Sequence, residues 1–518
     1  MSGEPKPQKK KKRWSRWKTV LLVLALLIVG LVVARRQWGR HADKVLQAEI
    51  DAIRARGEPL DWLAFRSEPI PDEENAGELY RQAWAIAPLD PFLASDDEEF
   101  VRLERLGSMV SDLAYYPEFR REHAEDLRQI LALSADALAL CRKARGLKQA
   151  DWKLNFRGPA ISVNTPPLAR QRELARLLCL AAITAHEAGD DAAAVEYLRD
   201  ALAAGRAVGA GPTLIHALVH LSIDAQATSG VEAIAPALRV GGDGGATAQQ
   251  VRKLIAELLD EKPIREGMVL AFMGERAMKF DTFERFRRGR LGVGALGLPS
   301  RGEAFLRAFQ PMLKVDEVRL LRHMTGYVDA MREETFPAAA ARLPVYEVPK
   351  ARIKRFTRLL SSILTPSVGR AVTLCYWQLA MRKMAAVALA IRLHEMDTIH
   401  RPEKLADLVG KYLPALPTDP FAADGRPLGY LPKAGKPRLY SISQDGKDDA
   451  GKFALDSRGE VDREFLDLVF FLNAGDRPLR PCEWEDPTTQ PAPGMGPRGR
   501  FGPPMPATFP VATLPSGR

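Results

Sequence analysis

The sequence is poor in cysteine and in long apolar segments. Its 518 residues contain four cysteines, none at the short spacing of a metal or redox motif, which excludes a disulfide-stapled scaffold. One uninterrupted apolar run approaches the thickness of a bilayer, which excludes a transporter with many spans. Charged residues make up 27% and hydrophobic residues 46%, as in folded proteins, so the chain is not wholly disordered.

Basic residues are in excess, and the excess is confined to the N-terminus. The formal net charge is +10, and residues 1–40 hold eleven Lys and Arg residues against the single acid Glu4. The rest of the chain is therefore neutral. Because nucleic-acid-binding domains carry a basic face on their folded part, we expect no nucleic-acid partner.

Residues 19–38 are expected to form a transmembrane helix. The run 19–34 would cover roughly 24 Å at 1.5 Å per residue, slightly less than a hydrocarbon core of ~30 Å. Trp17 and Trp38 flank it, where aromatic belts lie, and Lys18 can extend its ammonium group to the headgroups. Membrane lipid, contacted through this helix, is the first partner that we expect.

The distribution of basic residues predicts the orientation of this helix. The basic segment 1–18 contains eight Lys and Arg residues, whereas only Arg35, Arg36 and Arg40 follow the apolar run closely. The positive-inside rule then places the N-terminus in the cytoplasm and the bulk of the chain outside. A cleaved signal peptide is the alternative, since residues 32–34 resemble a small-residue cleavage site. The two arginines that follow favour an uncleaved signal anchor.

Residues 41–365 are expected to form a helical body. Apolar residues recur at helical spacing in three ranges: 41–56, 121–142 and 167–240. In the last range two helices are joined by a short turn, and Ala194, Leu198 and Ala201 lie on one side of the second helix. This hairpin weakly resembles a tetratricopeptide (TPR-like) helical repeat, which implies a solenoid-like stack with a concave binding surface.

A joint and a long packed helix are expected further along the chain. The glycine-rich residues 241–245 would form a flexible joint, and Thr247 with Gln250 predicts a capping box at the start of the next helix. Residues 368–396 are largely apolar but contain the charged pair 382–383 in the middle. That pair indicates a helix packed inside the protein and argues against a second membrane span.

The character of the chain changes after residue 402. Short β-type runs at 428–430 and 438–442 predict a hairpin, and 466–472 provides a further strand. Residues 475–518 are dominated by Pro, Gly, Thr and Arg without an apolar period, so we expect a disordered Pro-rich tail.

The segment 371–472 contains a helix, two short strands and a loop in an order that occurs in a known protein family. A long helix is followed by an Asp-Pro-Phe step at 419–421, then by a short strand that ends in Tyr430, and then by the strand and loop 439–449. This pattern resembles the body of a major pseudopilin of the type II secretion system. The resemblance implies a small α+β module over 366–474 whose last loop binds calcium. The N-terminal anchor lacks a prepilin cleavage motif, so assembly into a pilus is not implied.

The last loop of this module is a candidate metal site. Asp445, Asp448 and Asp449 lie within five residues around Gly446, and Asp419 lies on the preceding turn. Calcium takes carboxylate and carbonyl oxygens from flexible loops, so calcium is the one cofactor that the sequence suggests. A solvated acidic turn is the alternative, because Asp-Gly is a common turn sequence.

No catalytic motif is evident, and the candidates for an acid–base site lie at the end of the long helix. His394, Glu395 and His400 cluster there with Asp397. A metal or acid–base role is one interpretation. The other is that an imidazole caps the last carbonyls of the helix, where a positive charge also suits the helix dipole.

Three further motifs have simpler interpretations. His216 and His220 share one side of a helix, but Ala217 stands where a metalloprotease needs glutamate, so a packed pair is favoured. Residues 292–297 spell the dinucleotide-binding fingerprint without a preceding strand, which favours a flexible loop. The arginines at 285–290 are expected to form a solvated loop face, with lipid headgroups or an acidic partner as the alternatives.

The expected fold is mostly α: a single transmembrane helix, a solenoid-like helical body, a small α+β module with a short antiparallel sheet, and a disordered tail. This layout resembles uncharacterised bacterial membrane-anchored proteins, which implies an inner-membrane location. The sequence therefore predicts a scaffold or protein-interaction protein with a protein partner. The alternatives are an envelope hydrolase that uses His394, Glu395 and His400 between body and module, and an accessory subunit of a secretion apparatus.

Overall fold

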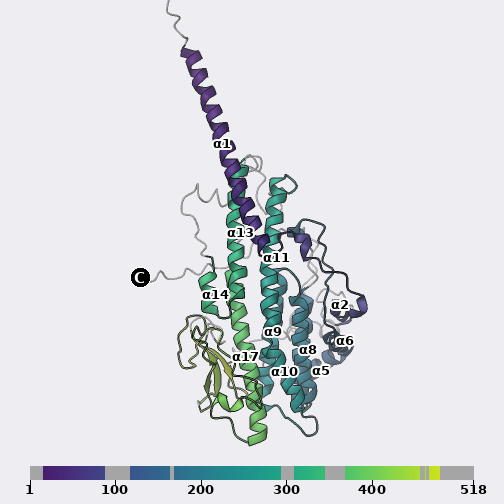
Figure 1. Ribbon diagram of the computed structural model, residues 1–518. Helices are drawn as coiled ribbons and strands as arrows, with labels where there is room; N and C mark the ends of the chain where they lie inside the picture. Colours follow the sequence, from purple (N-terminus) through teal and green to yellow (C-terminus); the bar gives the residue numbers. More distant parts are fainter. Residues whose placement is uncertain are drawn as a thin grey trace, which may run out of the picture.

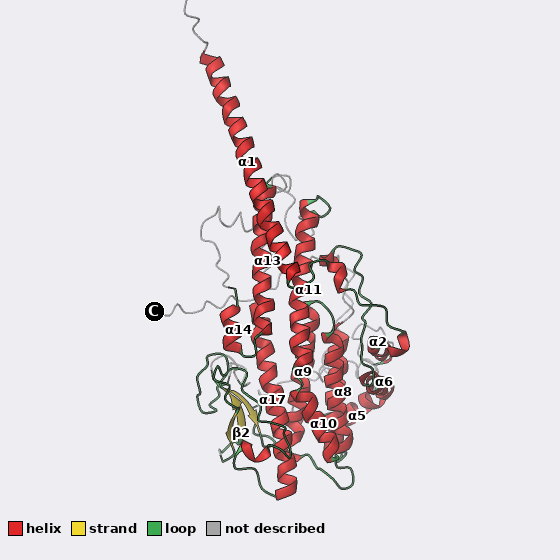
Figure 2. Ribbon diagram, in the orientation of Figure 1, coloured by secondary structure: helices red, strands yellow, loops and turns green. Residues whose placement is uncertain are grey.

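One long helix projects from a bundle of helices, and a small sheet lies at one side of that bundle (Figure 1 and Figure 2). The computed structural model describes residues 16–87, 117–163, 168–292, 294, 309–344, 368–433, 435–455, 461 and 466–478. The mostly helical fold is confirmed, with one apolar N-terminal helix and a three-stranded antiparallel sheet near the C-terminus. The basic segment up to residue 15 and the expected tail from residue 479 onward lie outside the described residues.

Helix α1 (Arg16–Ala55) begins at the apolar run and continues without a break into the body. Its residues 17–33 are exposed, and among the described residues it is the one helix long and apolar enough to cross a membrane. Further along, one side becomes buried, where Leu46 and Ile50 pack against α13 (Gln310–Arg332). The apolar helix is therefore a direct extension of the first helix of the body.

The next part of the body consists of short helices. They are α2 (Ala76–Ile86), α4 (Pro117–Glu122), α5 (Ala124–Leu133) and α6 (Ala135–Arg145). The single helix expected over 121–142 is thus wrong, since the chain breaks between these pieces. At one break the buried hydroxyl of Ser134 donates to the carbonyl of Ile130 at 2.7 Å. Such a side-chain bond competes with regular helical hydrogen bonding.

A helical hairpin follows, as the sequence predicts. Its helices are α7 (Leu168–Glu187) and α8 (Asp191–Gly209), and α9 (Leu214–Ile234) packs against both. The carboxylate of Asp190 accepts a hydrogen bond from the Ala193 N–H at 2.9 Å and caps α8. An N-cap of this kind fixes where the second helix begins.

The apolar residues predicted on one side of the second helix, and the glycine-rich segment predicted as a joint, both pack against this hairpin. Ala194, Leu198 and Ala201 are fully buried. The glycine-rich segment 241–245 forms a turn in which the carbonyl of Gly244 accepts the N–H of Asp191 at 2.7 Å. The segment is therefore held against the N-terminus of α8.

The remaining helices complete the bundle. Helix α10 (Ala248–Leu259) starts with the predicted capping box, in which Thr247 and Gln250 each accept the backbone N–H of the other. Helix α11 (Lys262–Arg287) is long and runs beside α13, and α14 (Phe336–Arg342) is short. The 3-10 helices are Trp62–Phe65, Asp72–Glu74, Ala160–Ser162, Ala235–Ala237 and Leu405–Leu408.

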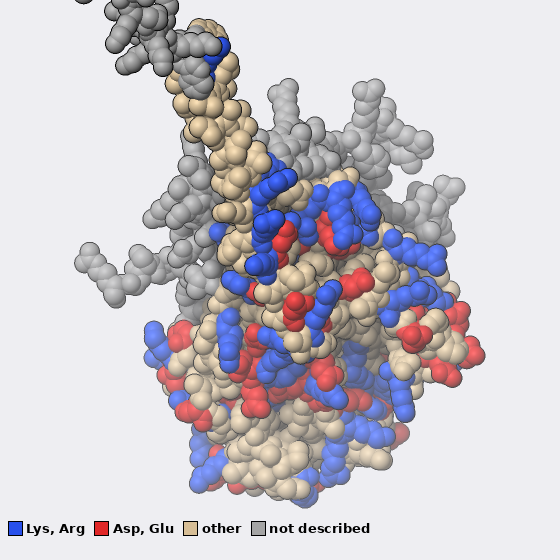
Figure 3. Space-filling view, turned by 45° about the horizontal axis from the view of Figure 1, so that its top comes forward, with Lys and Arg blue, Asp and Glu red and all other residues tan. Residues whose placement is uncertain are grey.

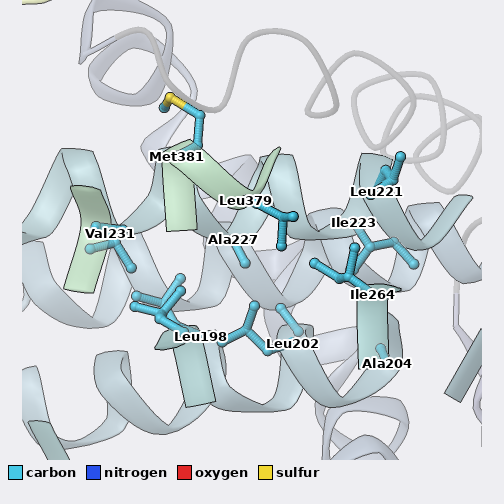
Figure 4. Packing of buried hydrophobic residues seen from close by; sticks show 14 of the residues in the cluster. Leu198, Leu202, Ala204, Leu221, Ile223, Ala227, Val231, Ile264, Leu379 and Met381 are labelled. Atoms are coloured by element: carbon cyan, nitrogen blue, oxygen red, sulfur yellow. The ribbon is translucent and has the colours of Figure 1, made fainter. Parts of the chain in front are cut away.

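Helix α17 (Gly369–Thr398) runs through the core. It packs against α9 and α10, and its other contacts include the sheet. Figure 4 shows Leu379 of this helix close to Ala227 of α9. Helices far apart in sequence thus share one core, whereas in a solenoid each layer contacts only its neighbours.

The charged pair in the middle of α17 is buried, as predicted. The Arg382 side chain donates to the carbonyls of Leu258 at 3.1 Å and Asp260 at 3.0 Å. The ammonium group of Lys383 forms an ion pair with Glu261 at 2.7 Å. These contacts satisfy carbonyl groups at the end of α10, which a helix leaves without partners of its own.

The three expected strands form one antiparallel sheet in the order β1 (Gly429–Leu431), β2 (Arg438–Ser441) and β3 (Leu468–Phe471). Leu439 of β2 lies opposite Phe470 of β3. All four residues of β3 are buried. The sheet packs against α17 through both β2 and β3.

Candidate functional site

The aspartates of the expected calcium loop bond to their own chain and to an arginine. Asp445 and Asp448 each accept the backbone N–H two residues further on, at 3.1 and 2.9 Å. Asp448 also accepts a hydrogen bond from Arg426 at 3.2 Å. Among the described residues, no group of three or more His, Cys, Asp or Glu side chains could hold a metal ion. The contacts thus match the hydrogen-bonded turn better than a calcium site.

Two buried aspartates organise this region instead. Asp419 accepts the hydroxyl of Ser441 at 2.7 Å, so it joins the Asp-Pro-Phe step to β2. Asp467, which directly precedes β3, accepts the N–H of Gly451 at 2.7 Å and is also bonded by the backbone of Asp449. Burial raises the pKa of Asp467 to about 6. Sequence reasoning missed Asp467, although an acid at the start of a fully apolar strand is a signal for a buried, bonded carboxylate.

The cluster at the end of α17 bonds mainly to the residues that follow the helix. The Nδ1 atom of His394 lies 3.0 Å from the carbonyl oxygen of His400. Glu395 forms ion pairs with Arg392 at 3.2 Å and with Arg401 at 2.8 Å. The imidazole thus faces a carbonyl, and two guanidinium groups hold the carboxylate. The carbonyl that faces His394 belongs to a residue beyond the end of α17, so the contact joins the helix to the following loop, and both the capping and the acid–base interpretation stay predictions.

The histidine pair of α9 is packed against glycines: His220 against two of α8, and His216 against Gly211 in the turn that follows. A Cβ atom at Gly209 would lie 2.3 Å from Nδ1 of His220, and one at Gly205 would lie 2.9 Å from the same ring. The hydroxyl of Thr213 lies 2.6 Å from Nδ1 of His216. Burial lowers the pKa of both histidines to about 4. They are therefore neutral packing residues at physiological pH.

The arginines around the end of α11 are mostly paired. Arg285 pairs with Asp281 at 2.7 Å, and Arg287 pairs with the buried Glu317 at 2.9 Å. Burial raises the pKa of Glu317 to about 7. Of the fingerprint 292–297 only Gly292 and Gly294 are described, and it follows a helix, whereas a dinucleotide site needs a strand before it.

A cluster of arginines around one carboxylate locks α1 to the body. Directly after α1 the side chain of Glu58 is buried, 2.7 Å from Arg276 of α11 and 2.6 Å from Arg332 of α13. Arg56 completes the cluster at 2.8 Å. Burial acts to raise the pKa of Glu58, but the hydrogen bonds from these arginines outweigh it and lower the pKa. Nothing in the sequence pattern indicates this junction.

A cavity of about 980 Å³ opens in the side of the body, between α2, α6, α8, α11 and α13. Its lining includes the apolar side chains of Val269, Leu270, Met273 and Met331. Six cationic side chains and one carboxylate also line it, namely Arg145, Lys148, Arg206, Lys262, Arg265, Arg332 and Glu266. The volume lies at the upper end of the range of ~300–1,000 Å³ typical of small-molecule sites.

Some of these cations already have partners, and two do not. Arg145 pairs with Glu196, and Arg332 pairs with Glu58. Arg206 and Lys148, in contrast, form no ion pair or hydrogen bond within the part of the chain that the structure describes. The cavity therefore presents positive charge that the described part of the chain does not neutralise.

A buried hydroxyl also lacks a partner at this cavity. Tyr80 of α2 lines it and is fully buried, yet its hydroxyl makes no hydrogen bond within the described residues. Burial, together with the nearby Cys141 and Asp200, raises its pKa well above the usual value, although the charges of Arg206 and Arg145 oppose this. The hydroxyl therefore stays protonated and available as a donor.

No protein-family model matches the chain, and neither a curated protein nor a solved structure does.

Proposed function

We propose that the protein is a single-pass membrane-anchored scaffold or protein-interaction protein, with its N-terminus in the cytoplasm and its body on the outer side of a bacterial inner membrane. The observation that carries this proposal is the continuity of α1, which joins an exposed apolar stretch to a packed helix of the body. A flexible tether would let the body drift from the bilayer. A continuous helix instead sets its height and orientation.

The contacts along α1 support a fixed mounting. Gly39 lies beside Pro311, the second residue of α13, and Glu49 pairs with Arg322 at 2.7 Å. Gly39 follows the apolar run by only five residues, which is roughly 8 Å of helix. The start of α13 therefore lies at the level of the lipid headgroups.

Basic side chains at this level suit phosphate groups. Gln310 of α13 donates to the carbonyl of Arg287, so the end of α11 lies at the same height. Figure 3 shows Lys and Arg side chains gathered where α1 enters the body. Such residues near a membrane surface are attracted to the phosphate groups of anionic lipids. This supports the interpretation that the body rests on the headgroups.

Topology mapping tests the proposed orientation. Alkaline phosphatase, which is active only outside the cytoplasm, would be fused after Arg518, and a fluorescent protein, which folds in the cytoplasm, would be fused before Met1. We expect both reporters to be active. Silence of both, with stable expression of each fusion, would show the opposite orientation and contradict the proposal.

A second experiment tests the scaffold role. Photo-crosslinking residues would be placed at exposed positions of the body, in the anchored protein and in a variant whose residues 1–34 are replaced by a cleavable signal peptide. We expect crosslinks to a defined membrane or envelope protein only with the anchored form. Identical crosslinks from both forms would mean that the anchor does not position the body for its partner.

The C-terminal module supports a second proposal, a secretion-apparatus accessory subunit. The order of a long helix followed by an antiparallel hairpin and an acidic turn is what the pseudopilin resemblance implies. Co-purification with pseudopilins from solubilised membranes would test this proposal. A chain that elutes free of them under conditions that preserve pseudopilin contacts would exclude it.

A further inference from the structure

We propose that the cavity between α2, α8, α11 and α13 binds a small amphipathic anion, in which an apolar chain or ring carries one carboxylate or phosphate group. The proposal is independent of the membrane orientation argued above. It rests on three features of one cavity: its apolar lining, its unpaired cations and a buried hydroxyl without a partner.

The cations define the charge of the ligand. Arg206 and Lys148 line the cavity and have no acidic partner among the described residues, whereas neighbouring arginines such as Arg145 are paired. An unpaired guanidinium in a partly buried site gains most from an anion that accepts its hydrogen bonds. The first turn of α11, at Lys262, also lines the cavity, and the positive end of that helix dipole favours the same charge.

The buried hydroxyl indicates that the ligand accepts a hydrogen bond inside the cavity. A fully buried polar group without a partner is rare, since it costs stability to desolvate and gains nothing in return. The hydroxyl of Tyr80 is such a group, and it lies in the field of Asp200 as well as of Arg206 and Arg145. The hydroxyl has no surface open to the cavity in the ligand-free protein, so it would donate to a carboxylate or phosphate oxygen held by Arg206 once the side chains that cover it shift.

The apolar lining defines the rest of the ligand. Val269, Leu270 and Met273 follow one another along α11, and Met331 faces them from α13. Methionine side chains adapt to irregular apolar shapes. A bound polypeptide would carry backbone N–H and C=O groups along its whole length, and each of them needs a hydrogen-bond partner. The aliphatic side chains of this lining have no hydrogen-bonding groups to offer. A single apolar chain or ring fits this lining better.

A titration tests the proposal directly. The full chain would be placed in nanodiscs of phosphatidylcholine, which has no net charge, and titrated with decanoate and, separately, with decanol, with protein-free nanodiscs as the blank. We expect saturable binding of one decanoate per chain, and binding of decanol at least tenfold weaker. Equal affinities for the two, or decanoate uptake no greater than in the blank, would overturn the proposal.

Two variants locate the site. Arg206→Gln should weaken decanoate binding about tenfold, because one charge-assisted contact is lost. Tyr80→Phe should weaken it several-fold, yet the ligand-free variant should melt at the same temperature as the parent or higher, because its unmet hydrogen bond is gone. Arg128→Gln is the matched control, since Arg128 is an exposed cation of α5 outside the cavity.

The same variants exclude the competing explanations. Unchanged affinity in Arg206→Gln would place decanoate elsewhere and refute the site. A short apolar peptide with a free C-terminal carboxylate is the remaining comparison. If it binds more tightly than decanoate and loses affinity with Arg206→Gln, the cavity is a peptide-terminus site and the proposal of a small amphipathic anion is wrong.

Discussion

Arg382 of α17 forms an ion pair with Asp224 of α9, and both side chains are buried in the core. The same guanidinium group also donates to the carbonyls of Leu258 and Asp260 at the end of α10. One side chain thus joins three helices.

Removal of Arg382 should therefore be among the most destabilising single changes in the protein. Arg382→Leu leaves a buried carboxylate and the end of α10 without their partner, and we expect a loss of about 3–5 kcal/mol in the free energy of unfolding. Urea unfolding of the full chain in a neutral detergent measures it. Arg128→Leu, which breaks an exposed pair with Glu125, should cost no more than about 0.5 kcal/mol. If Arg382→Leu lowered the free energy of unfolding by a similarly small amount, the buried ion pair would not contribute to the stability of the fold.

Glu58 should make the junction of α1 and the body sensitive to acid. Its arginine partners lower its pKa below the usual 4.5, so the native state favours the charged form. The stabilisation is thus present at neutral pH and is lost as the pH falls below about 4.5 through the pKa of the folded state. In Glu58→Gln we expect lower stability at pH 7 and a weaker fall of stability towards low pH. Parallel stability curves for the two proteins would contradict this role.

Gly209 should be required for the contact between α8 and α9. An added Cβ atom would lie 2.3 Å from His220, so Gly209→Ala forces the helices apart and should cost about 1–3 kcal/mol. A double-mutant cycle with His220→Ala should give a coupling energy above about 0.5 kcal/mol, because truncation of the ring removes the clash. Gly158→Ala is the control, since no atom lies within 4 Å of its added Cβ. Additive effects in the cycle would refute the proposed clash.

Calcium should not stabilise the C-terminal module. Asp445 and Asp448 already bond to backbone N–H groups, and Asp448 also bonds to Arg426. We expect the same melting temperature of the full chain with millimolar calcium and with a chelator. A rise that grows with calcium concentration and disappears in the double variant Asp445→Asn, Asp448→Asn would restore the calcium site.

Features that depend on neighbouring residues could be predicted from the sequence. The capping box at Thr247 and Gln250 is local, and so is the alternation that gave the strands around Tyr430 and Leu439. The burial of Arg382 could be inferred because a long apolar helix around it needs a core. Its partners could not, because Asp224, for example, is 158 residues away in the chain.

The candidate site shows the same division. The acidic turn and the cluster around His394 were visible as composition, but whether a carboxylate is free for a ligand depends on which donors the fold brings to it. Arg426 bonds to Asp448 of the acidic turn, and Arg401 pairs with Glu395 of the cluster. Both arginines lie outside the sequence motifs that predicted these sites. Nothing in the sequence marks Tyr80 or Arg206 as part of a binding site. An aromatic residue on a helix normally indicates a core position, and an arginine normally indicates a position facing solvent.

The sequence by itself determined the apolar helix, the concentration of charge around it and the class of most helices and strands. These features follow from hydrophobic length and periodicity, which are properties of consecutive residues. Only the tertiary structure decided which charges are neutralised, how α1 is fixed through Glu58, and that Tyr80 and Arg206 share a cavity. Burial and pairing are set by residues distant in the chain, and the cost of an unpaired buried group arises only once the helices are packed.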